Sequence, residues 1–180
     1  RASIGTGCDN SSGAGLIDTL GALNVDALPT PPDLVGVWHP SIHSFFLDAV
    51  GSYKWDPCGV IASFGYSTDI PVTGDWNGDG RDEVGVWRPG TRTFYLDFNG
   101  NYQWDTGVDI IATFGASTDR PVTGDWNGDG RDEIGVWRPS SQTFYLDFNG
   151  NGVWDAALDV TARFGMSTDI PVAGDWNNSG

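Results

Sequence analysis

Residues 71–89 read PVTGDWNGDGRDEVGVWRP, and residues 121–139 repeat them with Ile134 in place of Val84. The step between the two copies is 50 residues. Self-similarity at a fixed period is the sequence signature of a repeat protein, in which each repeat is one small structural unit. The chain is therefore expected to be built from modules of about 50 residues.

A weaker copy of the module comes first in the chain. Val37-Trp38-His39-Pro40 corresponds to Val86-Trp87-Arg88-Pro89, 49 residues later. Residues 1–32 fall outside the pattern and are expected to form an N-terminal extension or arm. The sequence thus predicts a three-repeat domain over 33–180, with modules at about 33–76, 82–126 and 132–176.

Each module is expected to form four short strands. Aromatic and β-branched residues favour strands, and Gly, Pro, Asn and Asp separate them. In the second module the predicted strands are Glu83–Arg88, Thr93–Phe98, Asp109–Phe114 and, leading into the next module, Pro121–Trp126. The predicted fold class is all-β, with three four-stranded repeats that resemble propeller blades.

The formal net charge of −15, from 24 acids against nine bases, argues against some partners. Such a chain is repelled by phosphate backbones and by anionic lipid surfaces, so nucleic acid is not an expected partner. No apolar run is long enough to span a membrane. An acidic balance is typical either of solubility or of cation binding, and the placement of the acids favours cation binding.

Two loops carry oxygen-bearing side chains at regular spacing. Positions one, three and five of the first are Asp75, Asn77 and Asp79, followed by a glycine at six and acids at eight and nine. Calcium takes about six to eight oxygen ligands, which alternate residues of a tight loop can supply. The alternative is an acidic turn without metal, in which the carboxylates would repel one another. The predicted calcium ligands, with each arginine contributing its backbone carbonyl, are Asp75, Asn77, Asp79, Arg81, Asp82 and Glu83, and Asp125, Asn127, Asp129, Arg131, Asp132 and Glu133.

A second type of loop is a weaker metal candidate. It also has side-chain oxygens at positions one, three, five and nine, but Asn-Gly between aromatic runs is equally typical of a hairpin turn. Gly152 at position six of the later copy favours metal, whereas Tyr102 in the earlier copy does not. The weaker candidates are Asp97, Asn99, Asn101 and Asp105, then Asp147, Asn149, Asn151 and Asp155, and finally Asp175, Asn177 and Asp33 at the ends of the repeat.

Nine tryptophans follow the repeat, three in each module. Aromatic residues locked to a repeat usually pack between strands or between modules. The alternative is a row of platforms on which sugar rings stack beside arginine side chains, although the arginines could instead stack on a ring or pair with loop carboxylates. The candidate glycan-binding residues are Trp87, Arg88, Trp137 and Arg138.

The two cysteines, Cys8 and Cys58, are expected to form one disulfide, with two free thiols as the alternative. A disulfide suits an oxidising compartment, so the expected location is extracellular or at the cell surface. Asn10 and Asn177 fit the glycosylation acceptor pattern, which is short and often occurs by chance.

The sequence contains no recurring set of catalytic residues. Its two histidines, His39 and His43, have no counterparts in the later modules, and there is no Gly-rich phosphate loop or zinc-like Cys/His spacing. Calcium loops explain the paired carboxylates better than acid–base catalysis does. We therefore expect a protein that is not an enzyme.

The stretch GDWNGDGRDE, followed by an apolar strand and spaced between Phe-Gly pairs, resembles the FG-GAP/VCBS repeats. Such repeats occur in integrin-like β-propellers and in bacterial and archaeal surface proteins. The resemblance covers about 65–176, and 33–64 more weakly. It implies adhesion, surface architecture or, in some lectins, sugar binding. It also implies a calcium loop between the last strand of one blade and the first of the next, with ligands at Asp75, Asn77, Asp79 and Glu83, and at Asp125, Asn127, Asp129 and Glu133.

The chain departs from that family by offering three modules, where propellers have at least four blades. Its last loop begins at Asp175 and has Ser179 where the other copies have aspartate, and its first module opens at Asp33. We expect head-to-tail self-association, in which the last loop of one subunit meets the Asp33 strand of the next in a ring or filament. A fragment of a longer repeat protein is the alternative.

These patterns together predict an extracellular, non-enzymatic, calcium-binding structural or adhesive repeat protein, such as a subunit of a filament or surface layer. The alternative function is a calcium-dependent lectin that binds glycans through the repeated tryptophans.

Overall fold

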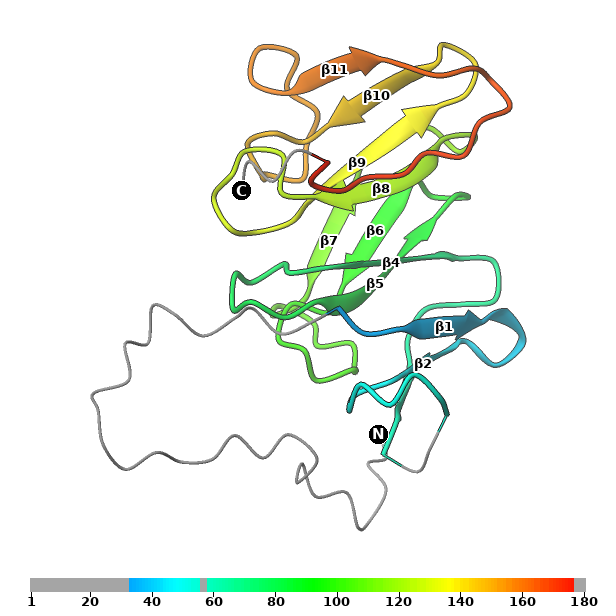
Figure 1. Ribbon diagram of the computed structural model, residues 1–180. Coiled ribbons are helices and arrows are strands. Elements are labelled where there is room, and N and C mark those ends of the chain that lie inside the picture. Colours follow the sequence, from blue (N-terminus) through cyan, green and yellow to red (C-terminus); the bar gives the residue numbers. More distant parts are fainter. Residues whose placement is uncertain (1–32, 56–57, 177–180) are drawn as a thin grey trace.

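The structure is a computed structural model that describes residues 33–55 and 58–176. These residues form three antiparallel sheets (Figure 1), which confirms the all-β class. The helical structure among them is one short 3-10 turn, η3 (Pro40–Ile42). The strands are β1 (Gly36–His39), β2 (Ser44–Leu47) and β3 (Val60–Ser63) in the first sheet, β4 (Ile70–Gly74), β5 (Glu83–Arg88), β6 (Thr93–Leu96) and β7 (Ile110–Thr113) in the second, and β8 (Arg120–Gly124), β9 (Glu133–Arg138), β10 (Thr143–Leu146) and β11 (Val160–Arg163) in the third.

Each sheet is a meander whose strands follow chain order. β4 pairs with β5, with Pro71 opposite Val86, and β8 pairs with β9 in the same way. The predicted strand Pro121–Trp126 corresponds to β8, which begins at Arg120 and ends at Gly124. β8 is the first strand of the third sheet, so the predicted loops connect two strands of one sheet. The expectation that they join two blades is wrong, because antiparallel pairing places the strands on either side of each loop side by side.

The strand β5 has the predicted bounds, whereas β6 and β7 are shorter than predicted. The N–H of Phe98, which follows β6, donates a hydrogen bond to the carboxylate of Asp109 at 3.1 Å. A side chain thus replaces the backbone partner that would have continued the ladder. Side-chain competition of this kind is characteristic of aspartate at the ends of strands.

The turns after β1, β5 and β9 share one conformation. His43, Arg92 and Gln142 occupy the same place and have left-handed φ values of 51°, 59° and 57°. The N–H of Arg92 donates to the carbonyl of Pro89, and the N–H of Gln142 to that of Pro139. The first module therefore keeps the local structure of the others although its sequence has diverged.

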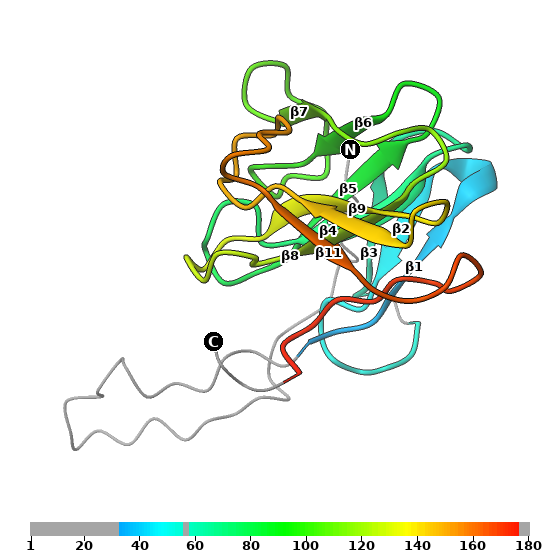
Figure 2. The same ribbon diagram turned by 90° about the horizontal axis from the view of Figure 1, so that it is seen from above.

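The three sheets pack against one another in chain order, as the side view and the view from above both show (Figures 1 and 2). Phe64 of the first module packs in a cluster with Val86 of β5. Phe114, which follows β7, packs in a second cluster with Val136 of β9. The middle sheet is therefore covered on both faces, and its Trp87 is fully buried.

Several predicted features fall at the edge of what the structure describes. Cys58 is disulfide-bonded. Its expected partner Cys8 lies outside the described residues, as do Asn10, Asn177 and the N-terminal extension 1–32. Within the described ranges, no helix has the length and apolar character that a membrane span requires.

Candidate metal centre

The β4–β5 and β8–β9 loops each gather three carboxylates. Asp75, Asp79 and Glu83 each place one oxygen atom within 4.8 Å of the others. Among residues 33–55 and 58–176, the structure shows two groups of this kind, and the second consists of Asp125, Asp129 and Glu133. Acidic clusters within ion-binding distance are thus present in both of the loops that the sequence singled out.

Asp75 folds its loop around its own carboxylate. Its Oδ1 accepts hydrogen bonds from the N–H groups of Gly78 and Asp79 at 2.7 and 3.1 Å, and its Oδ2 accepts one from Gly80 at 2.8 Å. The two glycines have φ values of 78° and 85°, which glycine adopts without steric strain. Asp125 makes the same three contacts in the other loop, at 2.7, 3.1 and 2.9 Å. The Gly-Asp-Gly sequence therefore sets the curvature that brings the acids together.

Glu83, at the start of β5, closes the loop from the protein interior. It is only 5% exposed, and its Oε1 accepts a hydrogen bond from the side-chain nitrogen of Asn77 at 2.9 Å. Burial, together with the charges of Asp79 and Asp75, raises the pKa of Glu83 to about 7. Burial likewise raises the pKa of Glu133 to about 7. A cation at either cluster would favour the ionised form of these carboxyl groups.

The asparagine at position three is anchored through its amide nitrogen. Asn77 and Asn127 donate hydrogen bonds to the carbonyls of Phe98 and Phe148 at 3.1 and 3.2 Å. The Oδ1 atom of Asn127 is buried and has no hydrogen-bond partner among the described residues. A buried unpaired acceptor costs about 1–3 kcal/mol. This oxygen, one of the predicted ligands, is therefore suited to binding a cation.

Asp82 and Asp132 are not members of the two clusters, although both were predicted as ligands. Asp132 instead holds the loop of the preceding sheet: its N–H donates to the Asp75 carbonyl at 2.8 Å, and its Oδ2 accepts the Asp75 N–H at 3.0 Å. Burial raises the pKa of Asp132, as do the charges of Asp82 and Asp125. Burial and the charge of Asp33 raise the pKa of Asp82. Asp132 thus connects the loops of the second and third sheets.

The remaining predicted ligands lie in or beside the same loops. Arg81 and Arg131 occupy position seven, and the N–H of Arg131 donates to Asp129 Oδ1 at 3.0 Å. Asp175 begins the third copy of the loop near the end of the described residues, and Asn177 lies beyond them.

The weaker loops, between β6 and β7 and between β10 and β11, hold their carboxylates in hydrogen bonds. Asp97 is fully buried and accepts the N–H groups of Tyr102 and Asn101 at 2.6 and 3.3 Å. Asp105 accepts the side-chain nitrogens of Asn99 and Asn101. The structure therefore brings these residues together as a hydrogen-bonded turn. The later copy makes related contacts through Asp147, Asn149, Asn151, Gly152 and Asp155.

A cavity of about 380 Å³ lies between the second and third sheets, beside the β8–β9 loop. Its wall combines Asp129 and Glu133 of that loop with Asp147 of the weaker loop and with the apolar side chains of Leu96 and Ile110. The carboxylates of a strong loop and a weak loop therefore border one space.

Trp87 and Trp137, predicted as candidate glycan platforms, are 0% and 1% exposed. Trp87 packs beside Phe94 with ring centres 6.2 Å apart, and Trp137 packs beside Phe144 at 6.3 Å. A sugar ring needs a free indole face, and these two rings have none. The glycan prediction is wrong for both residues, and the packing alternative is correct.

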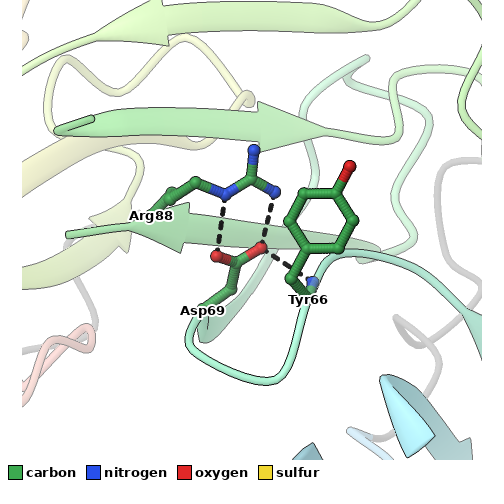
Figure 3. A network of polar contacts seen from close by, with 3 residues as sticks. All are labelled: Tyr66, Asp69 and Arg88. Atoms are coloured by element: carbon green, nitrogen blue, oxygen red, sulfur yellow. Dashed lines mark hydrogen bonds and ion pairs between the residues drawn. The ribbon is translucent and has the colours of Figure 1, made fainter. Parts of the chain in front are cut away.

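Arg88 lies against the carboxylate of Asp69 and beside the ring of Tyr66 (Figure 3). Its Nε and Nη2 donate to the two carboxylate oxygens of Asp69 at 2.9 and 2.8 Å. Its guanidinium carbon lies 4.2 Å from the ring centre of Tyr66 and 4.4 Å from that of Tyr95. Asp69 also accepts the N–H of Tyr66, which fixes the carboxylate in place.

The third sheet repeats this arrangement with Arg138 and Asp119, at 2.9 and 2.8 Å. Asp69 and Asp119 were not among the predicted site residues. Their signal in the sequence is the tripeptide Ser-Thr-Asp, which recurs at 67–69, 117–119 and 167–169. The copies at 67–69 and 117–119 come directly before β4 and β8, and their carboxylates bind the arginines at the ends of β5 and β9.

Comparison of the chain with protein-family models found no match, and comparisons with curated proteins and with solved structures found none either. The likeness to FG-GAP/VCBS repeats therefore rests on the motif and on the repeat length.

Proposed function

We propose that this chain is a non-enzymatic, calcium-binding structural or adhesive repeat protein that acts outside the cell or at its surface. In this proposal the three sheets are blades of the propeller type, and calcium binds in the Asp75–Glu83 and Asp125–Glu133 loops. The observation that carries the proposal is the acidic cluster itself, which occurs in two successive sheets with the same internal hydrogen bonds.

Calcium is the ion that best suits these loops. All the candidate side-chain ligands are carboxylate or amide oxygens, whereas zinc sites use mainly nitrogen and sulfur. Magnesium demands a near-ideal octahedron at about 2.1 Å, while calcium accepts the variable distances of a flexible loop. The buried and unpaired Oδ1 of Asn127 supplies a neutral oxygen beside the acids of its loop.

The link between successive loops supports a structural role for the ion. Because Asp132 binds the backbone of Asp75, an ion that orders the first loop also strengthens its contact with the third sheet. Extracellular calcium sites have dissociation constants of about 10⁻⁴–10⁻³ M. Calcium at ten times that constant stabilises the folded state by about 1.4 kcal/mol for each site.

The acids outside these loops support a non-catalytic role, because they are engaged in structural contacts. Asp69 and Asp119 pair with arginines, and Asp97 and Asp147 accept backbone N–H groups. The disulfide at Cys58 favours an oxidising compartment and therefore an extracellular location. The proposed partner is a further copy of the chain, arranged head to tail.

Calorimetric titration of the purified chain with calcium, at neutral pH after chelator treatment, tests the proposal. We expect about two ions per chain with dissociation constants of about 10⁻⁴–10⁻³ M, and a higher midpoint of thermal unfolding when calcium is present. The double variant Glu83→Gln, Glu133→Gln should lose both effects, because each substitution removes a carboxylate from one cluster. Asp169→Asn, which removes one charge outside both loops, serves as the control for the number of calcium ions bound. Equal calcium binding by the wild type and the double variant would rule out these loops as the sites.

A further inference from the structure

The segment that follows the third sheet has the sequence of a first strand. Residues 170–176 read IPVAGDW, and residues 70–76 read IPVTGDW. In the second sheet this sequence forms β4, which pairs with β5. Residues 170–174 have no strand partner within the described part of the chain. They follow β11 as a segment without strand assignment, drawn in red in Figure 1.

Two exposed side chains of this segment, Val172 and Trp176, have buried counterparts in the second sheet. Val72 and Val122 are 8% and 6% exposed, whereas Val172 is 70% exposed. Trp76 is 3% exposed, whereas Trp176 is 78% exposed. Large apolar side chains gathered on one exposed surface typically mark a site of protein contact.

The first sheet shows the complementary gap at the opposite end of the stack (Figure 1). β1, with the sequence GVWH, corresponds to the last four residues of β5, GVWR, but among the described residues it is the edge strand of a three-stranded sheet. On the equivalent edge, β5 is covered by β4 and β9 is covered by β8. Val37 in β1 is 65% exposed, whereas Val86 in β5 is fully buried. An exposed edge strand offers its unpaired backbone groups to a further strand.

We propose that Ile170–Gly174 of one copy adds to β1 of a second copy and becomes the first strand of that copy's first sheet. We assign a second copy as the occupant for the following reason. Its first sheet, placed after the third sheet of the first copy, would repeat the packing that the chain already forms between its second and third sheets. The register follows from the pairing of β4 with β5, in which Ile70 lies opposite Trp87 and Pro71 opposite Val86. Ile170 of one copy then lies opposite Trp38 of the next, and Pro171 opposite Val37.

A side-chain pair follows from the same register. In the second sheet, Arg88 at the end of β5 binds Asp69, which precedes β4. Asp169 holds the corresponding position before the segment, and its Oδ2 accepts the N–H of Met166 at 2.8 Å as Asp69 does that of Tyr66. His39 replaces the arginine at the end of β1. The carboxylate of Asp169 in one copy is therefore preformed to accept a hydrogen bond from His39 in the next.

A second contact joins the loops. Asp132 makes two hydrogen bonds with Asp75 of the preceding loop: its N–H donates to the Asp75 carbonyl, and its carboxylate accepts the Asp75 N–H. Asp33 precedes Trp38 as Asp132 precedes Trp137, by five residues in each case. Asp33 of the second copy is thereby placed to bind the backbone of Asp125 in the first. Such a head-to-tail interface is heterologous, so it propagates into a ring or an open filament.

This inference rests on the self-association part of the proposed function and does not require calcium in the loops. Disulfide trapping tests the register in the full chain carrying Val37→Cys and Pro171→Cys. Cross-strand pairs lie about 4.5–5.5 Å apart at Cα, within the range that a disulfide spans. We expect a ladder of covalent multimers on a non-reducing gel. The control is Ile42→Cys with Pro171→Cys, which adds the same number of thiols. Because Ile42 does not lie opposite Pro171 in the proposed register, this variant should give no ladder. Cross-linked monomers, or equal ladders from the two variants, would overturn the proposal.

Sedimentation over a range of concentrations tests the energetics. Val172→Asp changes a side chain that is exposed in the single copy, and we expect it to weaken association at least tenfold. His39→Arg restores the residue found in the other modules and should tighten association roughly tenfold. The matched control is His43→Arg, because the corresponding residue of the second module is Arg92 with the same left-handed backbone.

The outcomes separate this interface from the broader proposal. If Val172→Asp associates as strongly as the wild type, the chain self-associates through another surface and this interface is wrong. If the wild type stays monomeric at all concentrations, self-association fails as well, while calcium binding by the loops stands or falls on its own titration. Tighter association from His39→Arg and not from His43→Arg would assign the contact to the end of β1.

Discussion

The second and third sheets have nearly the same sequence and the same strand order, but they differ in what covers them. β5 and β9 have the same pattern of burial, and each is an interior strand of its sheet. The last strands differ: β7 has a buried alanine, while all four residues of β11 are exposed. Phe114 after β7 is 3% exposed, and its counterpart Phe164 after β11 is 76% exposed.

This difference shows that each sheet obtains much of its core from the sheet that follows it. Phe114 packs edge-to-face with Trp154 of the third sheet, at 6.0 Å between ring centres, and Phe64 packs with Trp104 at 6.1 Å. Proteins of this kind are stabilised by intrinsic repeat energies and by contacts between nearest neighbours. Matched substitutions in the two sheets therefore measure the contribution of the covering sheet directly.

The largest difference is expected between Phe114→Ala and Phe164→Ala. Removing a buried phenylalanine costs about 3–5 kcal/mol, whereas a substitution at an exposed site usually changes stability by less than about 0.5 kcal/mol. Urea unfolding of both variants, at a concentration where the wild type is monomeric, measures the difference. Equal losses of stability would mean that Phe164 is covered in solution by a part of the chain that the structure does not describe.

A smaller difference is expected between Asp119→Asn and Asp169→Asn. Asp119 accepts two hydrogen bonds from Arg138, whose side chain is 28% exposed, so we expect a loss of about 1–2 kcal/mol. Asp169 accepts the N–H of Met166 at an exposed position, and its substitution should cost less than about 0.5 kcal/mol. The same unfolding measurement compares them, and a larger loss at Asp169 than at Asp119 would contradict the assignment of the ion pair.

A single hydrogen bond between two sheets is expected to contribute less to the free energy of unfolding than the ion pair does. The hydroxyl of Thr123 in β8 donates to the carbonyl of Thr73 in β4 at 2.8 Å. Thr123→Ala should destabilise the fold by about 1 kcal/mol, and Thr73→Ala, which keeps the accepting carbonyl, should cost less. Denaturant midpoints of the two variants decide this, and the reverse order would show that this bond does not connect the sheets. The chain itself carries alanine at the corresponding position 173.

The repeat and its strands could be predicted because they depend on local sequence. Aromatic and β-branched residues between turn residues located β5 with its observed bounds, and the spacing of Asp75, Asp79 and Glu83 located the acidic cluster. These features arise within about ten residues of chain. The hydrogen bonds from the backbone N–H groups of Gly78 and Gly80 to the Asp75 carboxylate form within the loop itself.

The features that sequence reasoning missed depend on contacts between modules or between distant strands. The grouping of β8 with the third sheet is set by its pairing with β9, which no local pattern reports. Asp132 looked like a ligand of its own loop but binds the loop of the preceding sheet. Trp87 and Arg88 were candidate glycan-binding residues beside the packing alternative, and the structure buries Trp87 and places Arg88 against Tyr66.

In the acidic loops we expect the second and third sheets to behave alike, so these loops test whether a feature can form without the covering sheet. Glu83 and Glu133 are 5% and 6% exposed, and burial raises the pKa of each to about 7, above the ordinary 4.5. A carboxyl group whose pKa is raised by folding binds more protons in the native state between those two values. In the presence of chelator, the free energy of unfolding should therefore fall as the pH rises from about 4.5 to 7.

Glu83→Gln and Glu133→Gln should each remove a similar share of this pH-dependent loss, and the double variant should remove most of it. Unfolding free energies measured across that pH range, with chelator and then with millimolar calcium, check the prediction. Calcium should reduce the loss in the wild type, because it favours the ionised carboxylates, and should leave the double variant unchanged. If only one of the two substitutions alters the pH profile, the loops depend on the covering sheet as Phe114 and Phe164 do, and the internal hydrogen bonds of each loop are not enough to form it.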